Sequence, residues 1–169
     1  MTLDLARWGS LDGPMLARAL GAQVPGWPSA PGYRRLPGLL ERLRRDPAVA
    51  GWLDWLWIRT EFPSRLSVVG SGGFSGRPGP DGVAHFQCSL WGVDGSQGHA
   101  AEGARALLRW ALRNGANRIV ADTLAAQRSS IEILAKVGFR MVGPIPATAS
   151  VRFEIDQIDD EVSGVWSPP

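Results

Sequence analysis

Apolar residues at helical spacing predict two helices in the first third of the chain. One is expected over Leu11 to Leu20, with Gly21 just past its end. The second has a leucine stripe from Leu36 to Leu43 and is followed by Pro47. The segment between them, Val24 to Gly32, is so rich in proline and glycine that we expect an ordered loop there.

The pattern then changes to short apolar runs rich in valine, phenylalanine and tryptophan. Three such runs are separated by clusters of proline and glycine: Trp55 to Thr60, Leu66 to Phe74 and Val83 to Trp91. Runs of this length and composition, divided by turn-forming residues, predict three consecutive antiparallel strands.

The last third of the chain alternates between helix and strand patterns. Helices are expected after Gly98, ending at Asn114 and Gly115, and over Ser129 to Val137. Further strands are expected over Arg118 to Asp122, Phe139 to Val142 and Val151 to Ile158. We therefore expect an α/β fold of the layered α+β kind, in which helices flank a mixed, mostly antiparallel sheet. One domain should span residues 1–158, followed by a loosely ordered tail over 159–169.

Length and composition are typical of one globular domain. The 169 residues, of which 44% are hydrophobic and 20% charged, can bury a substantial core without disulfides. No apolar run is long enough to span a membrane and the amino terminus lacks a signal-peptide pattern, so we expect a cytoplasmic protein. Cys88 is the only cysteine and there are only two histidines, so neither an intramolecular disulfide nor a metal site is expected. The net charge of +2 does not indicate nucleic acid binding.

A glycine-bearing turn from Gly92 to Ala100 joins a predicted strand to a predicted helix. Backbone N–H groups at such a turn, with the free donors of the first helical turn, form a binding site for phosphate oxygens. A pyrophosphate group would therefore be a suitable ligand. The alternative is that the glycines only break the chain between two elements, because short glycine motifs are weak signals.

Four segments match, in order, the pattern of a known superfamily. They are Leu66 to Phe74, Asp81 to Phe86, the glycine turn with the helix that follows it, and Ser130 to Phe139. Together they resemble the GNAT acyltransferases, and within them the bacterial RimJ/RimL-like branch. The resemblance covers positions 35 to 156 and implies a GNAT fold and acetyl-CoA as co-substrate.

The resemblance also implies a site for coenzyme A. The family's pyrophosphate loop, Q/R-x-x-G-x-G/A, aligns with Gly95 to Ala100, and Gly95 replaces the usual arginine or glutamine. The end of the preceding strand should splay from its neighbour and offer backbone groups to the pantetheine arm. Gln127 and Ser130 occupy positions where the family often has asparagine and serine facing the cofactor. The expected cofactor contacts are Leu90, Trp91, Gly95, Ser96, Gln97, Gly98, His99, Ala100, Gln127 and Ser130.

At two positions that concern proton transfer, this chain differs from many relatives. Many relatives have a glutamate where this chain has His85, and a histidine can accept a proton because its unperturbed pKa is about 6.5. The alternative is that His85 is a polar residue of a sheet face or of the substrate pocket. Many relatives have a tyrosine acid where this chain has Leu134. Tyr33, the only tyrosine, belongs to the distant amino-terminal segment.

Side chains alternate along the predicted strand from Ala84 to Leu90, so His85, Gln87 and Ser89 should share one face and Cys88 should lie on the other. A lone mid-strand cysteine is usually a small buried hydrophobic residue, although a covalent acyl-cysteine route is conceivable.

Other conspicuous residues favour structural roles. His99 is expected to pack in or beside the turn. The arginines of the long helix should form a solvated face, from which one could reach the 3′-phosphate of the cofactor. The tryptophans near the first strands should divide between the core and the walls of the acceptor pocket. These two sets are Arg105, Arg109 and Arg113, and Trp27, Trp52, Trp55 and Trp57.

The sequence thus predicts an N-acetyltransferase that transfers an acetyl group from acetyl-CoA to a primary amine, by direct attack in a ternary complex. The amine could belong to a small molecule or to a protein N-terminus, as in some RimJ/RimL-like relatives. The alternative is a catalytically silent GNAT-fold protein that binds coenzyme A or another ligand. Exposed tryptophans, or an edge strand from Val151 to Ile158, could support a homodimer.

Overall fold

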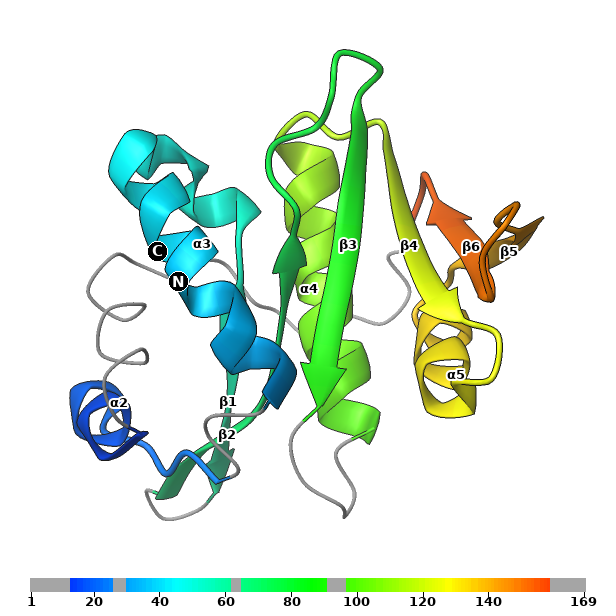
Figure 1. Ribbon diagram of the computed structural model, residues 1–169. Helices are drawn as coiled ribbons and strands as arrows, with labels where there is room; N and C mark the ends of the chain where they lie inside the picture. Colours follow the sequence, from blue (N-terminus) through cyan, green and yellow to red (C-terminus); the bar gives the residue numbers. More distant parts are fainter. Residues whose placement is uncertain (1–12, 26–29, 62–64, 91–96, 159–169) are drawn as a thin grey trace.

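The computed structural model describes residues 13–25, 30–61, 65–90 and 97–158. Over these residues the chain folds into one six-stranded sheet flanked by helices (Figure 1). The helices are α2 (Gly13–Leu20), α3 (Ala30–Arg45), the 3-10 helix η1 (Pro47–Trp52), α4 (Gln97–Arg113) and α5 (Arg128–Lys136). The strands are β1 (Trp55–Glu61), β2 (Arg65–Phe74), β3 (Val83–Leu90), β4 (Arg118–Leu124), β5 (Arg140–Pro144) and β6 (Ser150–Ile155). The mixed α/β class predicted from the sequence is confirmed.

The strand order in the sheet is β1-β2-β3-β4-β6-β5. The first three strands pair antiparallel, as predicted, and only β3 and β4 pair in parallel. The prediction that the segment from Val151 to Ile158 forms an edge strand is wrong: β6 ends at Ile155 and lies between β4 and β5. The strand at that edge is β5, because Arg140–Pro144 returns antiparallel along the outer side of β6.

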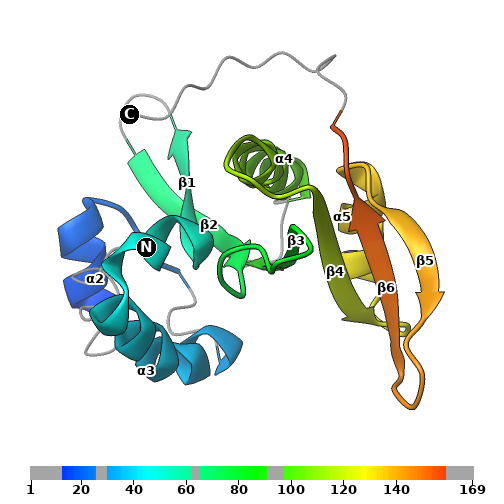
Figure 2. The ribbon, with the colours of Figure 1, turned by 90° about the horizontal axis from the view of Figure 1, so that it is seen from above.

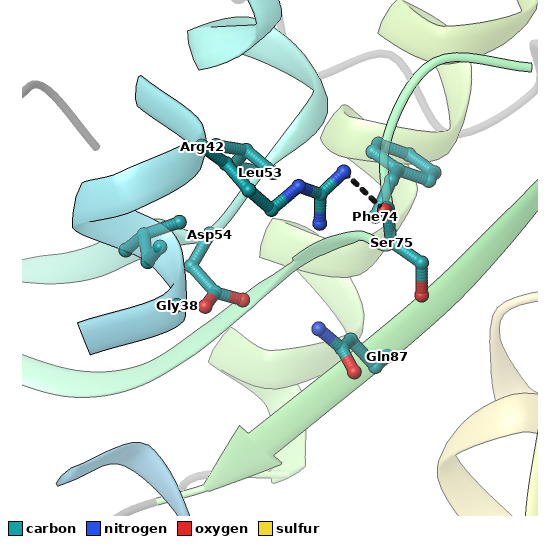
Figure 3. A pocket seen from close by; sticks show the side chains of 8 residues that line it. Gly38, Arg42, Leu53, Asp54, Phe74, Ser75 and Gln87 are labelled. Atoms are coloured by element: carbon teal, nitrogen blue, oxygen red, sulfur yellow. Dashed lines mark hydrogen bonds between the residues drawn. The ribbon is translucent and has the colours of Figure 1, made fainter. Parts of the chain in front are cut away.

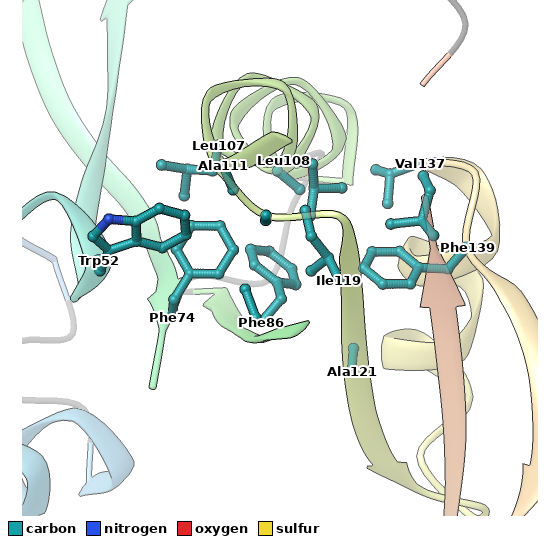
Figure 4. Close-up of a cluster of buried hydrophobic side chains, with 14 of the residues drawn as sticks. Trp52, Phe74, Phe86, Leu107, Leu108, Ala111, Ile119, Ala121, Val137 and Phe139 are labelled. Carbon is teal, nitrogen blue, oxygen red and sulfur yellow. The ribbon is translucent and has the colours of Figure 1, made fainter. Parts of the chain in front are cut away.

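The main core lies between the sheet and helix α4. A row of aromatic rings crosses the sheet under this helix (Figure 4). Neighbouring ring centroids are separated by 5.3 Å for Trp52 and Phe74, 5.8 Å for Phe74 and Phe86, and 6.1 Å for Phe86 and Phe139. The apolar stripe of α4 predicted from the sequence, Ala104, Leu107, Leu108 and Ala111, is buried against these rings. Burial of this apolar surface therefore fixes the position of α4 over the strands.

The helices form two layers on opposite faces of the sheet. Helices α4 and α5 cover one face, and α2 and α3 lie on the other face beside β1 and β2 (Figure 2). A small second core joins the end of α2 to this other face, where Ala22 and Val68 are buried and Leu20 packs against them. Gln23 anchors the end of α2 because it exchanges two backbone hydrogen bonds of 2.8 Å with Leu66 and Val68.

The structure corrects the predicted loop over Val24 to Gly32. Helix α3 already begins at Ala30 and runs through Pro37, while residues 26–29 lie outside the described part of the chain. Pro31 lies in the first turn of α3, where its missing N–H group would have no partner, whereas Pro37 lies inside the helix and removes one of its backbone hydrogen bonds. The tail over 159–169 also lies outside the described residues. None of the described helices is both long enough and apolar enough to cross a bilayer.

Candidate active site

Strands β3 and β4 run together only at their amino-terminal ends. Their parallel pairing covers Val83–His85 against Arg118–Val120. Beyond this point the described residues of β3 pair with β2 alone, and those of β4 pair with β6 alone. The two strands therefore separate toward their carboxyl ends, as Figure 1 shows.

Helix α4 begins at Gln97, after the segment that follows β3. Its first turn contains no acidic residue, so the partial positive charge of the helix start is not neutralised from within the helix. A Cβ atom added at Gly98 would meet no heavy atom within 4 Å. The first-turn N–H groups of an α-helix have no partner within the helix, so this end of α4 can bind an anion that approaches closely at Gly98.

The two faces of β3 differ in chemistry as the alternation predicted. Ala84 and Phe86 are buried in the core under α4, whereas His85 is exposed and Gln87 is half-buried. Gln87 lines a cavity of about 270 Å³ between β3 and α3, which we call the Gln87 hollow (Figure 3). The Gln87 hollow is lined by Gly38, Leu39, Arg42, Leu53, Asp54, Phe74, Ser75 and Gln87.

Polar groups of both signs meet in the Gln87 hollow. The Arg42 guanidinium points into it and donates a 2.5 Å hydrogen bond to the Ser75 carbonyl oxygen, and the Asp54 carboxylate lies on its wall (Figure 3). Gly73 lets β2 pass close beneath this wall, because a Cβ there would lie 2.1 Å from the Leu53 carbonyl oxygen.

A second depression, the His85 hollow, adjoins the first. It is lined by Ser75, Gly76, Arg77, Gly79, Asp81, Val83 and His85. Ser75 lines both hollows, and its N–H donates to the His85 carbonyl oxygen at 2.9 Å. A polar strip thus follows β3 from Gln87 to His85, up to the point where β3 and β4 separate.

The Asp122 carboxylate of β4 lies near enough to His85 for the two charges to interact. The Asp122 carboxylate accepts two hydrogen bonds from Arg152 of β6, at 2.8 and 2.7 Å. The Arg152 hydrogen bond holds the pKa of Asp122 below its usual range. Burial opposes this shift, and the charges of Arg152 and His85 add to it. Sequence reasoning missed both residues.

The sequence profile of the acetyltransferase (GNAT) domain family matches residues 31–140, more than half of the chain. The chain belongs to the GNAT acetyltransferase family. The chain is therefore a GNAT-type acyltransferase, and acetyl-CoA is the co-substrate that this family implies. No curated protein matches the chain in sequence.

Solved structures of other acetyltransferases share the fold of this GNAT protein at low sequence identity. Ribosomal-protein-S5-alanine acetyltransferase from Vibrio fischeri is 17% identical, with a TM-score of 0.57 over 97% of this chain and 93% of that one. Microcin C7 self immunity acetyltransferase MccE, solved with acetyl-CoA and AMP, is 12% identical, with a TM-score of 0.59 over 92% and 89%. A variant of the spermidine N-acetyltransferase SpeG from Vibrio cholerae is 12% identical, with a TM-score of 0.52 over 71% and 74%.

Those of the predicted cofactor residues that the structure describes lie on both sides of the gap between β3 and β4. Gly98, His99 and the backbones of Gln97 and Ala100 form the first turn of α4, and Leu90 ends β3. Trp91, Gly95 and Ser96 lie outside the described residues. On the β4 side, Gln127 immediately precedes α5, and its Oε1 atom accepts a 3.4 Å hydrogen bond from Thr123. Ser130 is half-buried in the first turn of that helix.

Several side chains discussed in the sequence analysis are buried or hydrogen-bonded within the fold. Leu134 is buried in the core, so α5 supplies no acid at that position. Burial raises the pKa of the Cys88 thiol to about 11, which disfavours the nucleophilic thiolate. Arg105 does not belong to a purely solvated face, because its guanidinium donates a 2.5 Å hydrogen bond to the Lys136 carbonyl oxygen at the end of α5.

Three of the four tryptophans singled out in the sequence belong to the core or pack against it. Trp52 and Trp57 are buried in the core, and Trp55 is packed against it. None of these three lines the Gln87 hollow or the His85 hollow. Trp27 lies outside the described residues, and Tyr33 belongs to the part of α3 whose side chains are not described. Within the described residues, no cluster of three His, Cys, Asp or Glu side chains is arranged to hold a metal ion.

Proposed function

We propose that this protein transfers the acetyl group of acetyl-CoA to a primary amine, by direct attack in a ternary complex, and that it belongs to the RimJ/RimL-like branch. The observation that carries the proposal is the separation of β3 from β4 just beyond His85 and Val120. This separation leaves the amino-terminal end of α4, where an anion can bind, beside the carboxyl ends of β3 and β4. The polar side chains of His85 and Gln87 lie on the face of the sheet opposite α4. Donor and acceptor can therefore approach one point from two directions.

The donor is proposed to bind along the carboxyl end of β3. Its pyrophosphate would lie against the amides of residues 95–100, with Gly98 permitting the close approach, and its pantetheine arm would pair with the backbone of Leu90 and Trp91. Gln127 and Ser130 would contact it from the α5 side. The proposal is supported by the open space at Gly98 and by the absence of acidic residues from the first turn of α4.

The acceptor is proposed to enter over the Gln87 hollow and the His85 hollow. A primary amine is mostly protonated at neutral pH and must lose a proton before its lone pair can attack the thioester carbonyl. His85 would accept that proton, directly or through a water molecule. Attack forms the new C–N bond, and collapse of the tetrahedral intermediate breaks the C–S bond and releases the thiolate of coenzyme A. The nitrogen loses its remaining extra proton to solvent, and the thiolate takes a proton from solvent, since Leu134 cannot supply one.

The proposed acceptor is a protein N-terminus or another amine that does not carry several positive charges. The Gln87 hollow contains both the Arg42 guanidinium and the Asp54 carboxylate, so its lining is not uniformly suited to a polycation. The named substrate of the Vibrio fischeri neighbour, a ribosomal protein, agrees with this choice.

We further propose that residues 1–158 form one domain and that the protein acts in the cytoplasm.

The role of His85 is tested with two variants, His85→Ala and His85→Gln. Each should lower turnover by ~10²-fold or more and remove the acidic limb of the pH–rate profile, because neither side chain can accept a proton near neutral pH. Acetyl-CoA affinity, measured by calorimetry, should barely change in either variant. If both variants keep near wild-type turnover with the same pH dependence, His85 is a pocket residue and the proton leaves to solvent.

A further inference from the structure

Asp122 is held in one orientation by its partner on the neighbouring strand. It lies directly opposite Arg152 in the antiparallel β4–β6 ladder. Arg152 Nε donates to Asp122 Oδ1 at 2.8 Å, and Arg152 Nη2 donates to Asp122 Oδ2 at 2.7 Å. Such a two-bond contact between planar groups fixes the carboxylate in position as well as in charge.

The sheet register places this carboxylate on the same face of the sheet as His85, just past the point where β3 and β4 separate. His85 is the neighbour of Val120 in the parallel β3–β4 ladder, and Asp122 lies two residues further along β4. Since residues two apart point to the same side of a strand, His85 and Asp122 share the sheet face opposite α4. The charge of His85 acts on Asp122 and contributes to the lowered pKa of its carboxyl, after the stronger effect of the Arg152 hydrogen bond.

The other charged groups near His85 are less suited to orient it. Arg77 and Asp81 line the His85 hollow. Arg77 is a cation, which cannot favour a protonated imidazole, and it forms an ion pair with Asp46 at 3.5 Å. Asp81 Oδ1 accepts a 3.1 Å hydrogen bond from the Val83 backbone. Asp122 differs from Asp81 in that Arg152 holds both of its oxygens and the charge of His85 acts on it.

We propose that Asp122, held by Arg152, is the positioning residue for His85. Its negative charge favours a proton on the imidazole nitrogen nearer to it, so that the other nitrogen keeps its lone pair for the acceptor amine. It also stabilises the imidazolium that forms when His85 takes the amine proton. The two hydrogen bonds from Arg152 stabilise the charged form of Asp122, so its carboxylate stays ionised when His85 takes the amine proton. The catalytic part of this inference rests on the proposed function.

The first test measures the tautomer ratio of the His85 imidazole and needs no substrate. Long-range ¹H–¹⁵N NMR spectra of the full-length protein, at a pH where both histidines are neutral, report the tautomer of each ring, and His85→Ala assigns the His85 signals. Asp122→Asn should change the ratio of the two His85 tautomers by about threefold or more. Asp156→Asn is the matched control, since Asp156 is an exposed carboxylate that pairs with Arg140 of β5 at 3.6 Å. An unchanged His85 ratio in a folded Asp122→Asn variant overturns the proposal.

The second test separates positioning from the base hypothesis. With any amine that is turned over, Asp122→Asn should lower kcat by ~10-fold or more with little change in the KM for acetyl-CoA. Arg152→Lys should give a smaller loss in the same direction, because it keeps the cation but loses the planar two-bond contact. If His85→Ala remains active while Asp122→Asn still shifts the tautomer ratio, the base assignment fails and the positioning contact stands. If Asp122→Asn alters neither kcat nor the tautomers, the contact itself is disproved.

Discussion

Gly103 of α4 lies so close to the Trp57 indole of β1 that a Cβ atom at position 103 would be 2.8 Å from Cδ2 of that ring. Trp57 also covers Gly72 of β2, where an added Cβ would lie 2.4 Å from its Cζ2 atom. Two glycines therefore let one buried ring pack between the sheet and α4. The distance of α4 from the sheet, and with it the position of the proposed pyrophosphate site, depends on this contact.

We predict that Gly103→Ala destabilises the fold. The added methyl group would have to displace the Trp57 ring, which is only 8% exposed, and overpacking of this kind costs ~1–3 kcal/mol. The free energy of unfolding in urea measures the effect. Gly98→Ala, in the same helix but with open space around it, should be neutral or slightly stabilising. Equal stability of the two variants would mean that α4 packs less tightly than described.

We predict that Gly98→Val weakens acetyl-CoA binding by ~10-fold or more without unfolding the protein. The valine side chain meets no protein atom near its Cβ, so it would occupy space proposed for the pyrophosphate. The control is Gly38→Val, which alters a glycine with equally open surroundings that lines the Gln87 hollow on the acceptor side, so it should leave acetyl-CoA affinity unchanged. Calorimetry on both variants checks the prediction, and equal affinities of wild type and folded Gly98→Val would place the phosphate site elsewhere.

The Asp122–Arg152 pair should contribute to stability in a pH-dependent way. Because the pKa of folded Asp122 lies below its usual value of 3.8, the contribution is fully present above about pH 5 and is lost as the pH falls through the folded pKa. The two side chains are 34% and 41% exposed, so screening limits the contribution to ~0.5–1 kcal/mol. Urea unfolding should show Asp122→Asn less stable than wild type at pH 7, with a difference that shrinks as the pH falls below 3.8. A difference that persists unchanged in acid would require another explanation.

Cys88 should not carry the acyl group. Since burial raises the pKa of its thiol to about 11, almost none of it is thiolate at neutral pH. Cys88→Ala should therefore keep turnover within about threefold of wild type, and mass spectrometry of the protein incubated with acetyl-CoA should find no acetylated cysteine. Loss of turnover by ~10²-fold in a folded variant, or an acyl adduct at Cys88, would instead indicate a covalent route.

Local patterns in the sequence predicted most of the helices and strands. Glycines placed at three helix ends have positive φ angles, +61° at Gly21, +103° at Gly115 and +102° at Gly138, a conformation that favours glycine over other residues. The start of α3 at Ala30 was missed because proline and glycine usually signal loops, although proline is compatible with a first helical turn.

Features that depend on long-range pairing could not be predicted. Alternation along β3 correctly separated His85 from Phe86, because it requires only the period of a strand. The Asp122–Arg152 contact joins residues 30 positions apart and depends on β6 inserting between β4 and β5. The Gln87 hollow likewise depends on how α3 packs against the end of β2, which no local pattern specifies.

The rate of coenzyme A release in the presence of an amine panel tests the central claim most directly. The panel pairs peptides that have free N-termini with the same peptides acetylated, and adds spermidine as a polycationic amine. We predict release that depends on both acetyl-CoA and a free amine, intersecting double-reciprocal plots as expected for a ternary complex, and an acetylated product in the mass spectrum. Saturable acetyl-CoA binding by calorimetry without release for any amine would contradict the account and would identify a GNAT-fold protein that binds the cofactor without catalysis.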